Sequence, residues 1–206
     1  MAKDILLVPH NHFDPTWRRC FDRPASYNGV TVRSYAEVEE HCIESWLKLA
    51  PRGYTFSEGQ AAVLRKYLEH NPERKEHLVR EIATGRLEIH RAGEVVPDSV
   101  MSTAEGLVRN FLVAEPLYRE LGADKLPAMK LAWLEDAFGN GPNYPQVLRG
   151  VGAEAAACLS YRPCPEPVWV GIDGSKIMVS DKHPSLFSGA FAKHAPCPSC
   201  HGQGCN

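Results

Sequence analysis

The chain has 206 residues, of which 44% are hydrophobic and 23% are charged, and its formal net charge is −2. This length and balance are typical of one globular domain with a sizeable core. The near-neutral charge gives no electrostatic basis for binding nucleic acid or an anionic membrane. No stretch resembles a signal peptide or approaches the ~20 apolar residues of a membrane helix, so we expect a cytoplasmic protein. The seven cysteines are odd in number and scattered, which favours reduced thiols.

The first predicted element is a buried strand over residues 5–8, a short apolar run that a proline ends. It leads into residues 10–17, which read HNHFDPTW. His12 and Asp14 are two residues apart, so their side chains point the same way on an extended chain. An imidazole and a carboxylate on one side of a strand end form half of a metal site. Trp17 adds a flat apolar face that suits a sugar ring.

Helices and strands then alternate along the chain. A short strand is predicted over residues 54–56, and residues 57–60 are interpreted as the N-terminal cap of the next helix. A second capping pattern at residues 102–105 begins another helix, which Pro116 should kink or end because proline cannot donate a backbone hydrogen bond.

Further strands are predicted over residues 87–91, 129–134 and 155–160. The second of these is followed by EDAFGNG at residues 135–141, where the glycines and the asparagine indicate a sharp turn. Asp136 therefore also stands at a strand end. Because the side chains at the strand ends of α/β folds gather at one edge of the sheet, the two segments suggest one shared pocket.

The last predicted elements are two short strands over residues 168–170 and 176–179, around an Asp-Gly pair typical of a hairpin. The alternation of strands and helices predicts an α/β fold with a parallel sheet or an opened barrel. No internal repeat is visible.

These motifs resemble the N-terminal domain of glycoside hydrolase family 38, the class II α-mannosidases. That family has a His-x-His-x-Asp-x-x-Trp motif near its start and an Asp-x-Phe-Gly motif after a later strand. A glycine-containing helix and a strand that ends in arginine follow. This chain supplies each feature in order, at residues 10–17, at residues 136–139, at Gly150 and Gly152, and at Arg162. The resemblance spans roughly residues 4–180 and includes the family's Gly-Arg-x-Glu run between the two motifs.

The resemblance implies a zinc-dependent retaining α-mannosidase, with residues 1–185 forming part of a (β/α) barrel of the glycoside hydrolase/deacetylase type. It implies one active-site zinc ion, with His12, Asp14 and Asp136 as ligands. Asp136 is also the implied nucleophile, a carboxylate that attacks the anomeric carbon of the sugar. The implied substrate is an α-mannoside or a related oligosaccharide. Neither a nucleic acid nor a membrane is expected as a partner, and self-association into a homo-oligomer is left open.

The resemblance also implies that Trp17, Phe138 and Arg162 contact the substrate. His10 is expected to support the ligands from behind. Glu135 should point to the opposite side if the extended geometry continues past the strand.

Other positions are expected to play smaller parts. Asp98 is expected only to fix a loop. The chain departs from the family at Asn110, where glutamine is usual, and at residues 140–141, where His-Ser is usual. Both departures bear on substrate choice.

The family's acid/base carboxylate and its fourth metal ligand come from later strands than any present here. We therefore expect this chain to be an incomplete catalytic domain that is inactive alone. The tail, residues 186–206, contains Cys197, Cys200 and Cys205 in a Cys-x-x-Cys-x-Gly-x-Gly setting. This setting resembles a chaperone-type zinc half-site, and its alternative is an unstructured terminus.

Two other functions are weighed against the favoured one. Amidohydrolases also place His-x-His at the end of a first barrel strand, but they need a bridging lysine and two further histidines at later strand ends. Lys130 lies at a strand start and His90 is isolated, which disfavours that class. The second alternative is a carbohydrate-binding or zinc-ribbon module without catalysis.

Overall fold

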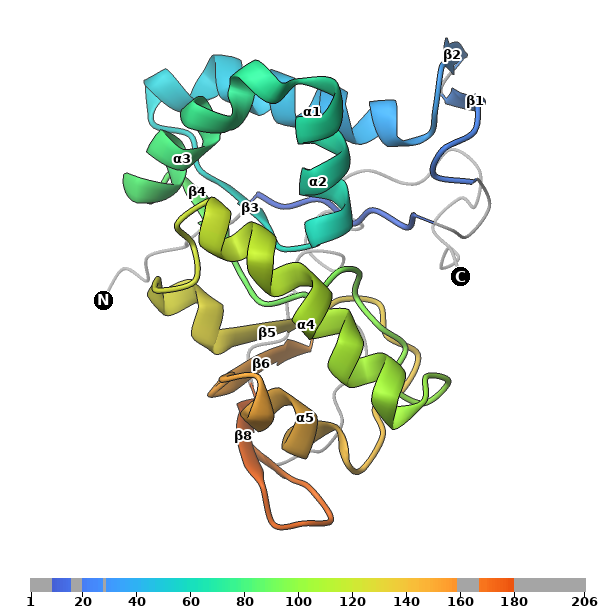
Figure 1. The fold of residues 1–206 in the computed structure, drawn as a ribbon, viewed down its shortest axis with the longest axis vertical. Coiled ribbons are helices and arrows are strands. Elements are labelled where there is room, and N and C mark those ends of the chain that lie inside the picture. Colours follow the sequence, from blue (N-terminus) through green and yellow to red (C-terminus); the bar gives the residue numbers. More distant parts are fainter. Residues whose placement is uncertain (1–8, 16–19, 28, 159–166, 180–206) are drawn as a thin grey trace, which may run out of the picture.

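The computed structural model describes residues 9–15, 20–27, 29–158 and 167–179. Its helices pack together over a set of short, mostly parallel strands (Figure 1). The α-helices are α1 (Ala36–Leu49), α2 (Ala61–His70), α3 (Lys75–Ala83), α4 (Ala104–Glu120) and α5 (Tyr144–Gly150). The 3-10 helices are η1 (Ala50–Arg52), η2 (Pro72–Arg74) and η3 (Pro127–Lys130). No described helix is both long and apolar enough to cross a membrane.

Most strands join into one row. The parallel pairs are β3 (Phe56–Glu58) with β4 (Leu87–Ile89), β5 (Leu131–Leu134) with β6 (Ala155–Cys158), and β6 with β8 (Lys176–Val179). Isolated parallel bridges, His10 to Ser57 and Arg91 to Ala132, connect the N-terminal segment to β3 and β4 to β5. The carboxyl ends of these segments therefore lie along one edge.

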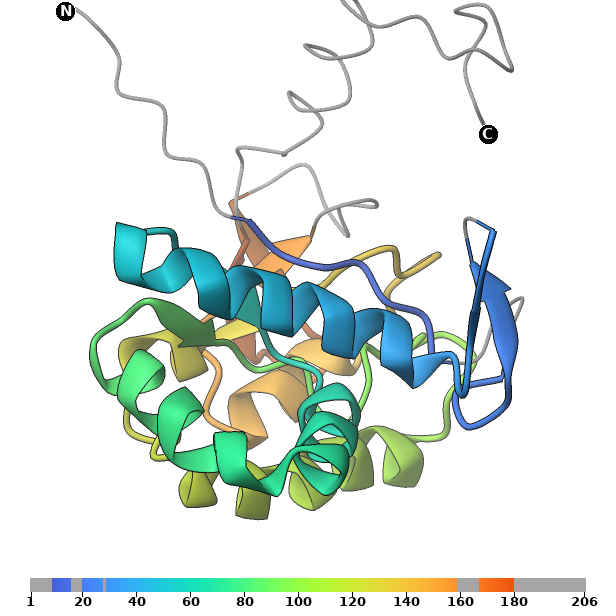
Figure 2. The same ribbon diagram turned by 90° about the horizontal axis from the view of Figure 1, so that it is seen from above.

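Two antiparallel pairs complete the strands. β7 (Val168–Val170) pairs with β8 at the end of the row, as the predicted hairpin requires. β1 (Ala25–Tyr27) and β2 (Val30–Val32) form a separate hairpin beside the start of α1 (Figure 2).

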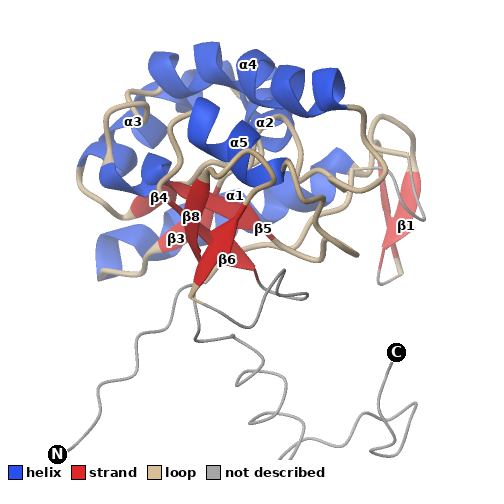
Figure 3. Ribbon diagram, turned by 90° about the horizontal axis from the view of Figure 1, so that it is seen from below, coloured by secondary structure: helices blue, strands red, loops and turns tan. Residues whose placement is uncertain are grey.

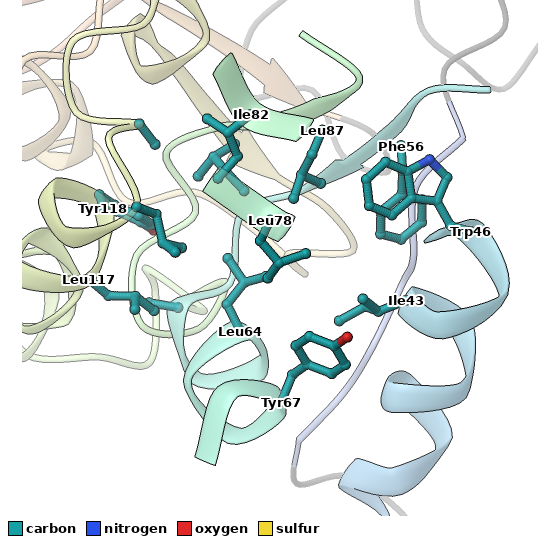
Figure 4. Close-up of a cluster of buried hydrophobic side chains, with 14 of the residues drawn as sticks. Ile43, Trp46, Phe56, Leu64, Tyr67, Leu78, Ile82, Leu87, Leu117 and Tyr118 are labelled. Atoms are coloured by element: carbon teal, nitrogen blue, oxygen red, sulfur yellow. The ribbon is translucent and has the colours of Figure 1, made fainter. Parts of the chain in front are cut away.

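The helices cover one face of the row (Figure 3). Side chains that alternate toward that face fill two hydrophobic cores, and each large apolar side chain that is fully buried contributes about 1.5–3 kcal/mol. The first core lies between α1–α4 and strands β3 and β4 (Figure 4). There Trp46 of α1 stacks on Phe56 of β3, with ring centroids 5.6 Å apart. The second core joins β5, β6 and β8 to α4 and α5.

The structure confirms the parallel α/β class and narrows two local predictions. The helix cap predicted over residues 57–60 is confined to Gln60, which is the N-cap residue of α2 but makes no side-chain cap hydrogen bond, whereas Ser57 and Glu58 belong to β3. Pro116 does not end α4, which continues to Glu120. We attribute this continuation to packing, since Leu117 is buried in the first core whereas the proline ring is exposed. The described strands form an open row, so the barrel stays a prediction.

Candidate active site

Two strand-end segments bring an imidazole and two carboxylates together. His12 follows the segment that bridges to β3, and Asp136 follows β5. The Nε2 atom of His12 lies 3.4 Å from Asp14 Oδ2 and 3.6 Å from Asp136 Oδ2. The shared pocket predicted from the sequence is therefore present, with the three implied ligands side by side.

A residue in the left-handed backbone conformation shapes the segment that follows β5. Asp136 has φ = 50°, the only positive φ among the described non-glycine residues. Aspartate adopts this conformation more readily than most residues because its short side chain can hydrogen-bond locally. The change of backbone direction ends the alternation of β5, so neighbouring side chains no longer point to opposite sides.

The position of Glu135 follows from this turn and corrects the sequence-based expectation. Its Oε1 atom lies 3.4 Å from both His10 Nδ1 and His12 Nδ1, and its Oε2 atom accepts a 3.2 Å hydrogen bond from Trp133 Nε1. Glu135 thus faces the same site as Asp136. Sequence reasoning missed it because period-2 alternation holds only while the backbone stays extended.

A layer of aromatic and polar side chains lies beneath these residues, on the face of the strands opposite the two cores. The Trp133 ring contacts His90 at 4.3 Å between centroids and His10 at 5.2 Å. His90 Nδ1 lies 3.2 Å from Ser57 Oγ. Burial lowers the pKa of His90 to about 3, so its ring is neutral and acts as packing rather than as a charged group.

The site opens into a pocket of about 260 Å³. It is lined by His12, Phe13, Asp14, Pro15, Gln60, Val96, Pro97, Asp98, Glu135, Asp136, Ala137 and Phe138. A larger but more open hollow of about 560 Å³ lies at the other end of the row of strands, and it contains no imidazole. It is lined by Arg149, Glu154, Val168, Gly174, Lys176 and Met178.

One side chain missed by sequence reasoning ties the pocket walls together. The buried Gln60 donates from Nε2 to the Phe13 carbonyl at 2.9 Å and accepts from the Val96 N–H at 3.2 Å. The loop at Val96 is also fixed by Asn110, which exchanges two hydrogen bonds with the backbone of Val95. The departure from the family at Asn110 therefore has a structural role beside the pocket.

The charges of the pocket are strongly coupled. The contact with Glu135 raises the pKa of His12 to about 9 against the opposing effect of burial, and Asp14 and Asp136 add to the rise. Burial opposes ionisation of Glu135, but its contacts with the His10 and His12 rings outweigh this effect and lower the pKa of Glu135 to about 2. Without a metal ion, His12 is thus an imidazolium among carboxylates.

Two further carboxyls are buried behind the His10–His12 segment. Burial raises the pKa of Glu39 and, together with the charge of Glu39, that of Glu58. Glu39 accepts a hydrogen bond from Asn11, and Glu58 accepts the backbone N–H groups of Gly59 and Gln60.

The remaining predicted site residues fall into two groups. Phe138 lines the pocket and is 72% exposed. Asp98 also lines it and accepts the Val100 N–H at 3.2 Å, which suits the predicted loop-fixing role. The others lie outside the described residues, and they are Trp17, Arg162, Cys197, Cys200 and Cys205.

The imidazole nitrogen and the carboxylate oxygens are donor atoms that bind metal ions, and some of the distances between them fit a single ion. Two ligands bound about 2.0–2.1 Å from one tetrahedral ion lie about 3.3–3.4 Å apart, close to the two distances from His12 Nε2. Within the described ranges, however, no group of three or more His, Cys, Asp and Glu side chains is arranged to hold a metal ion as it stands. Asp14 and Asp136 have side chains that are 39% and 43% exposed, so both have room to rotate.

The fold and the pocket together define an α/β domain with its polar groups at the carboxyl edge of parallel strands. Residues 2–185 match the family model of the glycosyl hydrolases family 38 N-terminal domain, and the chain belongs to this family. The resemblance seen in the sequence is confirmed.

Similar proteins include several mannosidases. The chain is 29% identical over 150 residues to alpha-mannosidase 2x of Mus musculus, covering 70% of this chain and 12% of that protein. It is 26% identical over 157 residues to a putative mannosylglycerate hydrolase of Halalkalibacterium halodurans, covering 76% and 16%. The chain thus spans a small fraction of the length of these relatives.

Solved structures show the same fold. An alpha-mannosidase from Enterococcus faecalis V583 superposes with a TM-score of 0.67 at 24% identity, covering 84% of this chain and 20% of that one. The 4-alpha-glucanotransferase from Thermococcus litoralis superposes with a TM-score of 0.58 at 18% identity, covering 81% and 28%.

Proposed function

We propose that this chain is the nucleophile-bearing part of a zinc-dependent retaining α-mannosidase. The observation that carries the proposal is the approach of His12 Nε2 to the carboxylates of Asp14 and Asp136 in a pocket at the carboxyl edge of the strands. The family membership and the names of the relatives indicate an α-mannoside as the substrate class.

His12, Asp14 and Asp136 would hold the cation, after rotation of the two aspartates. One imidazole and two carboxylates form a ligand set that zinc accepts. A bound zinc ion supplies Lewis acidity that orients sugar hydroxyls and keeps a nearby carboxylate ionised.

Asp136 acts as the nucleophile in this proposal. Its carboxylate oxygen attacks the anomeric carbon, the bond to the leaving group breaks, and a glycosyl ester forms on Asp136. Phe138 stands beside it as an apolar face for the sugar ring. Trp17 and Arg162 are proposed as further substrate contacts.

The amidohydrolase alternative gains no support from the described residues. Lys130 forms an ion pair with Glu154 at 2.9 Å and does not line the pocket. His90 is buried beneath the site and is not one of its walls.

The sharpest test uses a substrate that needs no acid catalyst. A fluorinated α-mannosyl fluoride loses fluoride without protonation, so the glycosyl ester can form and accumulate even where no acid/base residue is present. We expect the zinc-loaded chain to gain one covalent sugar, which peptide mass spectrometry places on Asp136.

The Asp136→Asn variant is the matched control, because asparagine keeps the turn but cannot form the ester. Labelling of another carboxyl would reject Asp136 as the nucleophile. If a chain that binds zinc remains unlabelled, the enzyme proposal fails and the non-catalytic carbohydrate-binding module is favoured.

A further inference from the structure

We infer that Glu135 is a positioning residue, which holds the His12 ring so that its Nε2 atom faces Asp14 and Asp136. The inference rests on the proposed function, because it concerns how this chain prepares a cation ligand. It adds a residue that the sequence motif does not mark.

The contacts of Glu135 use both of its oxygens. Oε1 lies 3.4 Å from His12 Nδ1 and 3.4 Å from His10 Nδ1, while Oε2 accepts the Trp133 Nε1–H at 3.2 Å. The side chain is 13% exposed, whereas His12 is 38% exposed. The carboxylate is therefore the better-fixed partner, and the imidazole adjusts to it.

The support beneath Glu135 is closely packed. Trp133 packs against the rings of His10 and His90. A Cβ atom at Gly59 would lie 2.5 Å from the carbonyl oxygen and the ring of His90, so the backbone just after β3 approaches this layer closely. Such packing restricts Trp133 to one orientation, and the indole N–H in turn fixes Glu135.

The consequence for His12 concerns its two ring nitrogens. A carboxylate beside Nδ1 favours the tautomer that carries its proton there, which leaves the lone pair on Nε2. That nitrogen faces the two aspartates. Carboxylates that hold a ligating histidine in this way affect metal affinity by about 10–100-fold.

The test is cation binding by the chain itself, with Co²⁺ as a coloured probe and Zn²⁺ in competition. Glu135→Leu should weaken binding by about 10–100-fold, while Glu135→Gln, which keeps an acceptor oxygen, should recover part of the affinity. Glu40→Leu is the matched control. Glu40 also contacts a histidine Nδ1, that of His70 at 2.5 Å, and is 10% exposed, but it does not line the pocket.

The outcomes separate this inference from the proposed function. Absence of Co²⁺ binding by the unaltered chain, or binding that survives His12→Ala, would overturn the proposed cation site and this inference with it. Binding that His12→Ala abolishes but Glu135→Leu leaves unchanged would overturn only the role of Glu135. An equal loss in Glu40→Leu would show that the effect is general destabilisation.

A measurement on the unaltered chain keeps the inference testable even if Glu135→Leu does not fold. Long-range proton–nitrogen correlation spectra of the Zn²⁺-bound chain show which ring nitrogen of His12 carries the proton. We expect a protonated Nδ1 and a metal-bound Nε2. A protonated Nε2 with metal on Nδ1 would overturn the inference.

Discussion

At the residue scale, Gln60 shows how one buried side chain fixes a pocket. It satisfies a carbonyl at Phe13 and an N–H at Val96, which lie 47 and 36 residues away in the sequence. Leaving a buried backbone polar group without a partner costs about 1–3 kcal/mol. Gln60 therefore couples the loop that carries His12 and Asp14 to the opposite wall.

Gln60→Leu should lower the free energy of unfolding by about 1–3 kcal/mol and weaken Co²⁺ binding, because both loops lose their link. Urea unfolding and Co²⁺ titration measure the two effects. Gln60→Glu keeps an oxygen that can accept the Val96 N–H. Near pH 5, about the ordinary pKa of a carboxyl, this variant should therefore have a larger free energy of unfolding than Gln60→Leu. Unchanged metal affinity in Gln60→Leu would show that the loops hold their places independently.

The buried pair Glu39 and Glu58 predicts a pH dependence of stability. Their pKa values are raised in the folded chain, so the folded state binds more protons than the unfolded state once the pH exceeds about 4.5. The free energy of unfolding therefore falls as the pH rises toward 8 and the two carboxyls ionise. Glu39→Gln removes the repulsion and should raise the melting temperature at about pH 8 but not at about pH 4.5.

Glu44 provides a control, because its pKa is shifted in the opposite direction. Burial opposes its ionisation, but hydrogen bonds from Tyr67 and Arg74 lower its pKa. Its stabilisation is present above the unfolded pKa and is lost as the pH falls, so Glu44→Gln should lower the melting temperature at about pH 8. If both variants shift stability in the same direction at that pH, the argument from the carboxyl pair is wrong.

At the element scale, the site depends on where strands stop. The ligands implied by the sequence could be predicted because His12, Asp14 and Asp136 follow short apolar runs and match a spaced motif. Glu135 could not, because its orientation depends on a left-handed turn that no periodicity reveals. Gln60 stands at the N-cap of α2, as its place in the predicted cap implies, but only the contacts across the pocket show what its side chain does.

The close approach of Gly59, just after β3, to the aromatic layer predicts a contrast between two glycines. Gly59→Ala would place a methyl group 2.5 Å from His90 and should cost about 1–3 kcal/mol through overpacking. Gly150, at the end of α5, has no heavy atom within 4 Å of an added Cβ, so Gly150→Ala should be neutral or slightly stabilising. Thermal unfolding of the two variants side by side measures the contrast, and equal melting temperatures would contradict the packing argument.

At the scale of the whole molecule, the parallel class was predicted from the alternation of strands and helices, whereas barrel closure remains untested. The described strands form an open row. The proposed chemistry of the site is likewise only partly carried by the described residues. In the proposal one carboxylate of the pocket attacks, and the acid/base carboxyl is expected from outside the described residues.

The chain assayed alone should therefore depend steeply on the leaving group. Without a group to protonate the departing oxygen, about 10²–10⁴-fold of rate is missing for ordinary aryl mannosides. We expect at most slow turnover of a dinitrophenyl α-mannoside and none detectable of a methyl α-mannoside. A series of substrates with leaving groups of increasing pKa measures this dependence. Turnover independent of the leaving group would show that a carboxyl within these residues acts as the acid.

The long sequence separations across the pocket have a consequence for folding kinetics. Helices form from local contacts, but the bonds that assemble the pocket join Phe13 to Gln60, 47 residues apart, and Gln60 to Val96, 36 residues apart. Folding steps that depend on such non-local contacts are slow relative to helix formation. A refolding chain should regain its helical circular dichroism before it regains the ability to bind a cation, so metal binding marks completion of the native state rather than collapse.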